Sequence, residues 1–375
     1  MSIKKLGKNR YMVRVVVARI AGRQKFHNKT IRGERSEALA YEKEITARRN
    51  KGLSVAPSSI TLDSHIQKWL ASRRAKGNVR ENSLETYQEF LGRYVLPFIG
   101  SVKLAQLNPL HIETVIESLL KKGLSPNTVR HSLTILHASL RQAVRWGLLH
   151  ANPVDAVELP ATERPESRAL DEKEAKSFLR ALAGSPFRAL FTFALYTGLR
   201  PEEYFGLAWA DLDLDACLVR VRRTLVWRRL EKGWYFGSPK SKKSEREVRF
   251  RPALAELLRE HKRHQIEASM KVRKFYRSDL DLVFADALGL PLRRQDISKK
   301  YLRPVVAAAE ITGRVTLYTL RHTYATLLLA SNEKPKTVSE NMGHSKVAFT
   351  LDTYGHVLPS MRDEAAVRLE KILKS

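Results

Sequence analysis

The sequence predicts a multidomain α+β protein: a small β-sheet-plus-helix N-terminal head, an all-α middle domain, and a mixed, mainly α C-terminal domain with a small β-sheet. Three observations predict this plan. Apolar residues alternate loosely near the N-terminus, recur at helical spacing after residue 60, and mix both periods after residue 168. Linker-like compositions at residues 52–59 and 153–165 separate these regions. A length of 375 residues also suits two or three domains.

The balance of charge is the dominant compositional feature. The chain has 67 Lys and Arg residues against 39 Asp and Glu residues, which gives a formal net charge of +28. Such an excess favours a polyanionic partner, most often nucleic acid. The alternatives are a merely basic protein and a membrane-surface binder, but no cationic amphipathic helix stands alone in the chain.

The composition also excludes several classes of protein. The single cysteine, Cys217, cannot form an internal disulfide or a cysteine-based zinc site. No apolar run approaches the ~18 residues of a membrane span. Residues 1–5 begin a basic region and lack the apolar segment of a signal peptide. We therefore expect a soluble, intracellular protein with no membrane partner.

Residues 1–55, the predicted head, contain 15 Lys and Arg residues and four acidic ones. The valine-rich residues 11–20 and residues 24–31 are predicted to be two strands joined by a turn. Ser36 is a candidate N-cap for a helix with Ala38, Tyr41 and Ile45 on one face. A small basic sheet can enter a DNA groove; the alternative is an ordinary capping element.

Residues 60–158 are predicted to form a compact domain of four amphipathic helices. Pro109 suits a first helical turn, and Gly147 ends the longest apolar stripe. We expect Trp69 and Trp146 to lie in the core. Basic side chains on the outer faces are available to phosphates, although most would only be solvated. The four stripes comprise Leu62, Ile66, Trp69 and Leu70; Leu84, Tyr87 and Leu91; Ile112, Val115, Ile116 and Leu119; and Val129, Leu133, Leu136, Leu140 and Val144.

From residue 168 onward the pattern is mixed. Helices are predicted around residues 172–183 and 187–197, and strand-like runs at residues 218–228 and 234–237 lead into a lysine-rich turn. Helices return after residue 252, with a short strand expected at residues 282–284.

Two arginine segments suggest phosphate chemistry without a metal, since no phosphate-binding glycine loop and no metal-ligand pattern is present. Arg200, in Thr-Gly-Leu-Arg-Pro-Glu-Glu, precedes a helix start, where backbone N–H groups also favour an anion. Glu203 is placed to hold a guanidinium. Arg321 lies in an apolar-faced helix, where an arginine requires a partner or an anionic ligand.

Two further motifs complete an ordered set. Met342-Gly343-His344 follows Arg321, and Tyr354 lies ten residues after His344. The set resembles the tyrosine recombinase (phage integrase) family, whose hallmarks are Thr-Gly-Leu-Arg-x-x-Glu, His-x-Leu-Arg-His, Leu-Gly-His and a nucleophilic tyrosine. The resemblance is detailed from about residue 168 onward and looser over the helical domain and the head.

The resemblance implies a role for each matching residue. Tyr354 would be the nucleophile, while the two motif arginines and His344 would contact the phosphate. Glu203 would support the arginines, and His322 would assist deprotonation of the tyrosine. These roles need no cofactor and no metal.

The lysine and the second motif are less well matched. A catalytic lysine is implied between the first two motifs, where Lys240 aligns best and Lys242 is the alternative. The family usually has histidine where this chain has Tyr318. A phenol can donate a hydrogen bond to a phosphate oxygen but cannot have imidazolium charge, so Tyr318 is kept as a candidate site residue.

The family also implies an activity and an assembly. The expected function is site-specific DNA recombination through a 3′-phosphotyrosine, which integrates and excises a mobile element; the alternatives are a DNA-binding regulator that keeps the fold and a type IB topoisomerase-like enzyme. Residues 1–55 would bind arm-type DNA, residues 60–158 core DNA, and residues 168–375 would form the catalytic domain.

The expected partners are double-stranded attachment sites of core and arm type, three further copies in a homotetramer, and DNA-bending and directionality proteins. The C-terminal segment, residues 361–373, would form a helix that docks on a neighbouring subunit; the alternative is that it folds back on its own domain. The expected location is cytoplasmic, in association with the bacterial nucleoid.

Overall fold

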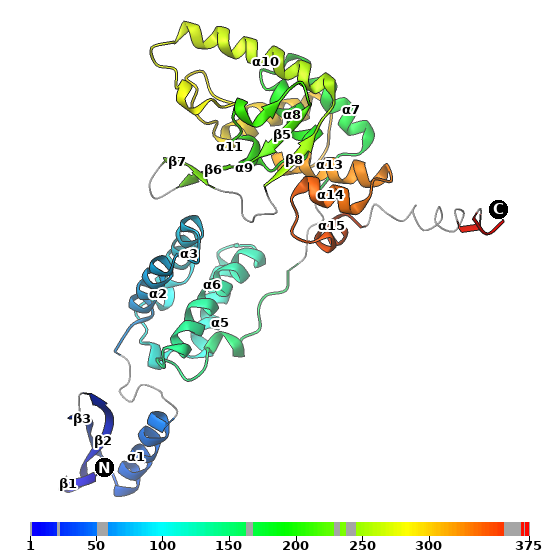
Figure 1. Ribbon diagram of the computed structural model, residues 1–375. Coiled ribbons are helices and arrows are strands. Elements are labelled where there is room, and N and C mark those ends of the chain that lie inside the picture. The colour runs from blue at the N-terminus through cyan, green and yellow to red at the C-terminus, as the bar shows by residue number, and fades with distance from the viewer. Residues whose placement is uncertain are drawn as a thin grey trace. The chain divides into compact units, whose positions relative to one another are not determined.

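The computed structural model describes residues 2–20, 23–50, 59–162, 168–228, 233–237, 245–355, 369, 370 and 372–374. The chain divides into two compact units, Met1–Arg164 and Pro165–Ser375 (Figure 1). Helices dominate both units and the sheets are small, which confirms the predicted α+β class.

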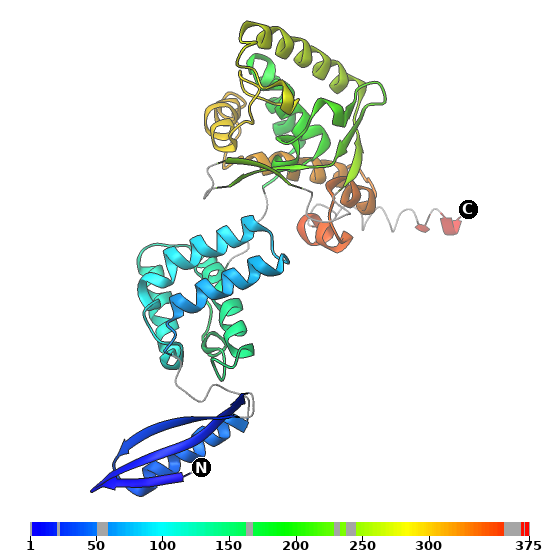
Figure 2. The same ribbon diagram turned by 60° about the vertical axis from the view of Figure 1, so that its left-hand side comes forward.

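The N-terminal region is an antiparallel sheet covered by one helix, as Figure 2 shows. The strands are β1 (Ser2–Gly7), β2 (Arg10–Ile20) and β3 (Arg23–Arg32), in the order β1-β2-β3, and the helix is α1 (Arg35–Asn50). Val13, Val15, Ala38 and Ile45 are buried between them. The helix begins at Arg35, two residues earlier than an N-cap at Ser36 predicts, so Ser36 lies inside α1 and its hydroxyl donates to Glu34 instead of capping the helix.

The helical region has the four predicted helices, α2 (Leu62–Lys76), α3 (Glu81–Tyr94), α5 (Pro109–Lys121) and α6 (Pro126–Arg145), together with the short α4 (Leu96–Ile99), η1 (Leu104–Gln106) and η2 (Pro153–Ala156). Thr61, Asn108 and Ser125 cap three of the helices through their side chains. Trp69 is buried as expected. Trp146, however, is 39% exposed, because it follows the last residue of α6; its ring makes a T-shaped contact with His65.

The helices of the second unit pack around α8 (Arg188–Thr197), which is buried on most sides. The others are α7 (Glu172–Ala181), η3 (Leu182–Gly184), α9 (Pro201–Tyr204), η4 (Trp209–Asp211), α10 (Pro252–Lys271), η6 (Ser278–Leu280), α11 (Arg294–Asp296), the π-helical η7 (Ile297–Leu302), α12 (Arg303–Ala308), α13 (Leu317–Ala330), α14 (Pro335–Met342) and α15 (Val347–Tyr354). Tyr354 therefore ends the last helix of the site region.

Two small sheets accompany these helices. One has the order β4-β5-β8, from Leu212–Asp213, Leu218–Val221 and Arg246–Arg249; the other pairs β6 (Thr224–Arg228) with β7 (Gly233–Gly237). The single strand-like run expected at residues 218–228 is thus two strands in different sheets. The strand expected at residues 282–284 is wrong, because Leu282 makes only an isolated bridge to Ala208.

No helix in the described part of the chain is long and apolar enough to cross a membrane.

Candidate active site

Arg200 is positioned by a turn between two helices. Gly198 ends α8 with φ +61°, a left-handed conformation that favours glycine, and Arg200 then precedes Pro201, the first residue of α9. The Arg200 side chain donates from Nη1 to Glu203 Oε1 at 2.9 Å and from Nη2 to the Gly343 carbonyl at 3.1 Å. The predicted pairing of Glu203 with a guanidinium is therefore present.

Glu203 also binds a second arginine, which sequence reasoning missed. Arg246, on β8, donates from Nη1 to Oε1 at 3.0 Å and from Nη2 to Oε2 at 2.9 Å, while its Nε donates to the Asn341 carbonyl at 2.5 Å. Both side chains are buried. Burial opposes ionisation of Glu203, but the hydrogen bonds and charge of Arg246 and the charge of Arg200 outweigh it and lower its pKa to about 2.

Arg321 lies on α13 with 4% of its surface exposed. Its Nη1 donates to the Gly198 carbonyl at 2.7 Å and its Nη2 to the Met342 carbonyl at 2.6 Å. Burial and the nearby Arg200 charge lower its pKa to about 9, which still leaves the guanidinium charged at neutral pH. The partners required by its burial are thus main-chain oxygens from both flanking motifs.

His344 lies between Arg321 and α15. Its Nε2 is 3.0 Å from Arg321 Nη2 and its Nδ1 is 2.8 Å from the Thr350 hydroxyl. A guanidinium can only donate, so Nε2 accepts, and Nδ1–H donates to Thr350. Burial and the charge of Arg321 lower the pKa of His344 to about 3. The imidazole is therefore neutral, and Arg321, which can only donate, fixes its tautomer.

Tyr354, the predicted nucleophile, contacts His322. The phenol oxygen is 2.7 Å from His322 Nδ1, and the tyrosine is 2% exposed. Burial raises the pKa of Tyr354 to about 12, although Arg321 and Arg200 oppose that rise. Burial and the charge of Arg321 lower the pKa of His322. A neutral imidazole can therefore accept the phenolic proton.

Tyr318 has a different partner from the one expected. Its hydroxyl donates to Glu202 Oε2 at 2.9 Å, and Arg294 donates to Glu202 Oε1 at 3.1 Å. The Arg294 guanidinium carbon also lies 5.0 Å from the centre of the Tyr318 ring. Burial and Glu202 raise the pKa of Tyr318 to about 12. The phenol therefore stays protonated, and its O–H group makes its hydrogen bond to the Glu202 carboxylate.

The structure therefore brings Arg200, Arg321, His344 and Glu203 into one hydrogen-bonded network, beside the His322–Tyr354 pair. Tyr318 belongs to a separate group with Glu202. Lys240 and Lys242 lie outside the described residues, in the segment between β7 and β8, as does most of residues 361–373. The remaining members that sequence reasoning missed are Arg246, Glu202, Arg294 and Thr350.

These groups suit the transfer of a phosphoryl group to a phenol. Two arginines can fork onto the non-bridging oxygens of a phosphodiester, and the buried phenol has a base at hydrogen-bond distance. In the described part of the chain, no group of three or more His, Cys, Asp or Glu residues is arranged to hold a metal ion.

The comparison with protein families decides the assignment. Residues 168–361 match the phage integrase family, and residues 61–120 match the N-terminal SAM-like domain of phage integrases. The chain belongs to the phage integrase family. The resemblance inferred from the motifs is thereby confirmed, and the integrase is an enzyme of the site-specific tyrosine recombinase class.

Relatives over the full length support the same class. The integrase is 28% identical to a tyrosine recombinase XerC-like protein of Caldanaerobacter subterraneus, over 98% of this chain and 97% of the relative. It is 25% identical to the ICEBs1 integrase of Bacillus subtilis, over the whole of both chains. It also matches the transposase of transposon Tn916 from Enterococcus faecalis, at 26% identity over 91% of this chain and 83% of the relative.

Solved structures share the fold. The integrase of transposon Tn1549, in complex with a circular intermediate DNA, matches with a TM-score of 0.67 at 22% identity, over 84% of this chain and 100% of the other. A lambda integrase dimer bound to a core site matches with a TM-score of 0.57 at 16% identity, over 79% and 95% of the two chains.

Proposed function

We propose that the integrase joins a mobile genetic element to host DNA, and releases it again, through a covalent 3′-phosphotyrosine at Tyr354. The observation that supports this proposal best is the 2.7 Å contact between the Tyr354 phenol and a neutral His322, beside two buried or half-buried arginines. A phenol placed in this way can lose its proton and attack phosphorus.

Each cleavage step is balanced by one bond made and one bond broken. The Tyr354 oxygen forms a bond to the scissile phosphorus while its proton passes to His322, and the bond from phosphorus to the 5′ oxygen breaks. Arg200 and Arg321 stabilise the charge on the non-bridging oxygens, most strongly in the transition state. In the reverse step a 5′ hydroxyl of another strand displaces the tyrosine, so the phosphodiester energy is conserved.

The departing 5′ oxygen needs a proton, and we assign this role to Lys240. It lies between β7 and β8, outside the described residues, with Lys242 as the alternative. Arg246, which binds Glu203 from β8, follows Lys240 by six residues and Lys242 by four. His344 would contact the phosphate through Nε2 once Arg321 releases that nitrogen and the imidazole proton moves from Nδ1 to Nε2, with the Thr350 hydroxyl then donating to Nδ1. Tyr318 would contact the phosphate by releasing Glu202.

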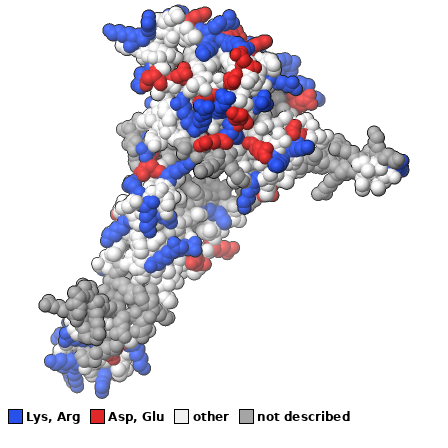
Figure 3. Space-filling model, viewed as in Figure 1, with Lys and Arg blue, Asp and Glu red and all other residues white. Residues whose placement is uncertain are grey.

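The proposed substrate is double-stranded DNA with core-type and arm-type attachment sites. Lys and Arg side chains are scattered over the described residues on the face seen in Figure 3, and such side chains can contact the phosphates of a duplex. Residues 1–55 would bind arm sites, residues 60–158 would bind core sites, and residues 168–375 would perform the reaction in the cytoplasm, at the nucleoid.

The proposed active assembly is a homotetramer on two duplexes, with DNA-bending and directionality proteins as accessory partners. A lambda integrase structure is a tetramer bound to a Holliday junction, and it matches this chain with a TM-score of 0.56 at 17% identity. Residues 361–373 would dock on the neighbouring subunit in such an assembly.

The test uses nicked attachment-site duplexes that trap cleavage. Incubation with the full chain should give a protein–DNA adduct on a denaturing gel, and Tyr354→Phe should abolish it while DNA binding persists. Absence of an adduct with the wild-type chain would favour the DNA-binding regulator. Relaxation of supercoiled DNA without any site preference would favour the topoisomerase-like enzyme.

A further inference from the structure

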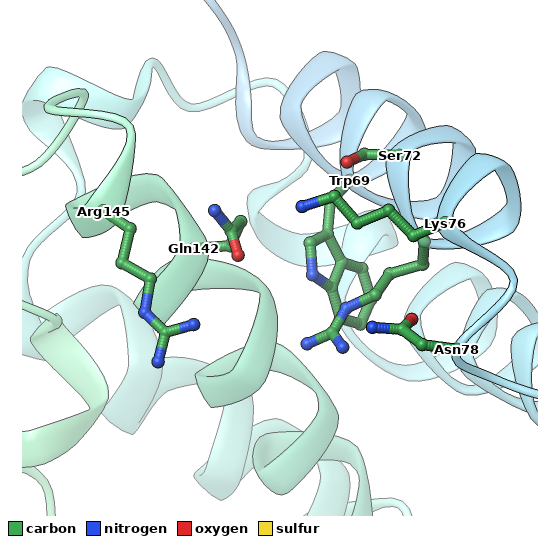
Figure 4. A pocket seen from close by; sticks show the side chains of 7 residues that line it. Trp69, Ser72, Lys76, Asn78, Gln142 and Arg145 are labelled. Atoms are coloured by element: carbon green, nitrogen blue, oxygen red, sulfur yellow. The ribbon is translucent and has the colours of Figure 1, made fainter.

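A small pocket in the helical region is lined by polar and basic side chains (Figure 4). Trp69, Arg73 and Lys76 come from α2, where spacings of four and seven residues place them on one face. Gln142 and Arg145 come from the last turn of α6. Gly77 ends α2 with φ +61°, and the chain turn brings Asn78 to the same pocket. The pocket has a volume of about 100 Å³, several times that needed by one water.

The indole N–H of Trp69 is the first observation that points to a ligand. Trp69 is 1% exposed, yet its Nε1 has no hydrogen-bond partner among the described residues. Its ring stacks on Tyr87 at 5.7 Å between centroids, and the Arg73 guanidinium carbon lies 5.6 Å from the ring centre. A buried donor left unpaired is costly, so a bound acceptor in the pocket would complete the site.

The charge of the pocket is the second observation. Three of its lining residues are cations, none is acidic, and Arg73, Lys76 and Arg145 form no ion pair within the described part of the chain. The pocket also lies at the C-terminal ends of α2 and α6, each of which contributes about half a negative charge. About two positive charges therefore remain, which is sufficient to favour an anion.

We propose that this pocket binds one backbone phosphate of double-stranded DNA, through Trp69, Arg73, Lys76 and Arg145. The inference rests on the proposed DNA recombination and adds a specific anchor for the duplex on the helical region. Arg73 and Arg145 supply planar donors to phosphate oxygens, and the indole N–H supplies a neutral one. Such a contact fixes the register of the protein on the duplex without reading a base.

The test measures binding of the full chain to an attachment-site duplex by fluorescence anisotropy over a range of salt. Arg145→Gln should raise Kd about tenfold and reduce the slope of log K against log salt by about one. Trp69→Phe keeps an aromatic ring but removes the indole N–H, and it should weaken binding with the slope unchanged. Lys121→Gln is the matched control, because Lys121 is also exposed at a helix end but lies near the start of α6, about 30 Å from its last turn.

A neutral methylphosphonate placed at each backbone position in turn identifies the phosphate. At one position the substitution should weaken binding by the wild-type chain about tenfold. At that position the Arg145→Gln variant should bind the modified and the unmodified duplex equally well, because both changes remove the same contact. The proposal would be overturned if Arg145→Gln and Lys76→Gln left Kd and slope unchanged. It would also be overturned if, at every backbone position, the loss of affinity from the methylphosphonate multiplied with the loss from Arg145→Gln. Adduct formation through Tyr354 at saturating protein would persist in those cases, which separates this failure from failure of the recombinase function.

Discussion

Glu203 is the residue on which two arginines from distant parts of the sequence meet. Arg246→Gln leaves its buried carboxylate with Arg200 alone, and breaking one partner of a buried pair costs about 3 kcal/mol or more. In a unit of this size we expect the midpoint of thermal unfolding to fall by about 10 °C. Calorimetry of the full chain measures this midpoint. The midpoint of Arg246→Lys should lie between those of the wild-type chain and Arg246→Gln, because lysine keeps the charge but loses the two-donor contact with Glu203.

A double-mutant cycle controls this prediction. Glu203→Gln combined with Arg246→Gln should lower the midpoint by less than the sum of the two single changes, because neither partner is then left as an isolated buried charge. Additive losses would contradict a direct energetic link between the two side chains.

The pair of His322 and Tyr354 predicts the pH dependence of cleavage. The pKa of His322 lies below its usual 6.5, so the imidazole remains neutral as pH falls from neutral and becomes protonated only below that value. The single-turnover rate of adduct formation should therefore stay level down to about pH 6.5 and decline only in more acid solution. His322→Gln keeps an acceptor but no base, so it should lower the rate about 100-fold and remove the acid decline. An acid decline that survives in this variant would assign it to another group.

Tyr318 provides a contrast to the two arginines of the network. Because its hydroxyl donates to Glu202, Tyr318→Phe should reduce the cleavage rate less than tenfold, whereas Arg321→Lys should reduce it about 100-fold or more through loss of the forked donors. Single-turnover rates on the same nicked duplex compare the two. A loss in Tyr318→Phe as large as that in Arg321→Lys would indicate that the phenol stabilises the phosphate as strongly as the buried guanidinium does.

Most of the site was predictable from the spacing of chemical groups along the chain, but its supporting contacts were not. Arg200, Glu203 and Arg321 stand in recognisable motifs. Arg246 lies among alternating charges and looks solvent-facing, although Val248, two residues on, is fully buried on the same face of β8. That alternation was the available signal. The partner of Tyr318 could not be predicted, because Glu202 is 116 residues away in the sequence.

At the scale of the element, the turn after α8 sets the distance between α8 and α13. A Cβ at Gly198 would lie 2.3 Å from the Tyr324 ring on α13, and the Gly198 carbonyl accepts from Arg321. Gly198→Ala should therefore lower thermal stability and cleavage together. Gly123→Ala, also at positive φ but with nothing within 4 Å, should cost only about 1 kcal/mol and leave cleavage unchanged. Equal losses in the two variants would mean that the φ angle alone matters.

Helices were predicted better than strands because a helix is specified locally. The stripes of α2, α3, α5 and α6 are periodic over three or four turns and need no partner to be recognised. The strand β1 was missed, since it has few apolar residues and exists through its pairing with β2. Residues 282–284 have the composition of a strand but make only a bridge to Ala208, because a short apolar run indicates burial more than conformation.

At the scale of the whole molecule, deletion of the chain after Pro359 tests the proposed assembly. We expect the shortened chain to cleave a single nicked site, since Tyr354 and its described partners remain, and to fail to form the complex that joins two duplexes. Adduct gels and native gels measure the two properties separately. Normal joining by the shortened chain would mean that the tail folds back on its own domain.

The main-chain oxygens that bind Arg321 orient its side chain before DNA binds. A peptide carbonyl orients a guanidinium and leaves its positive charge in place. A carboxylate would orient the guanidinium and also neutralise its charge. The positive potential at this position is therefore created when the polypeptide folds, and little reorganisation is needed when the scissile bond arrives. The same arrangement makes the site sensitive to the backbone, because a small shift of the segment at Gly198 or at Met342 would break a hydrogen bond that orients the guanidinium, even without DNA bound.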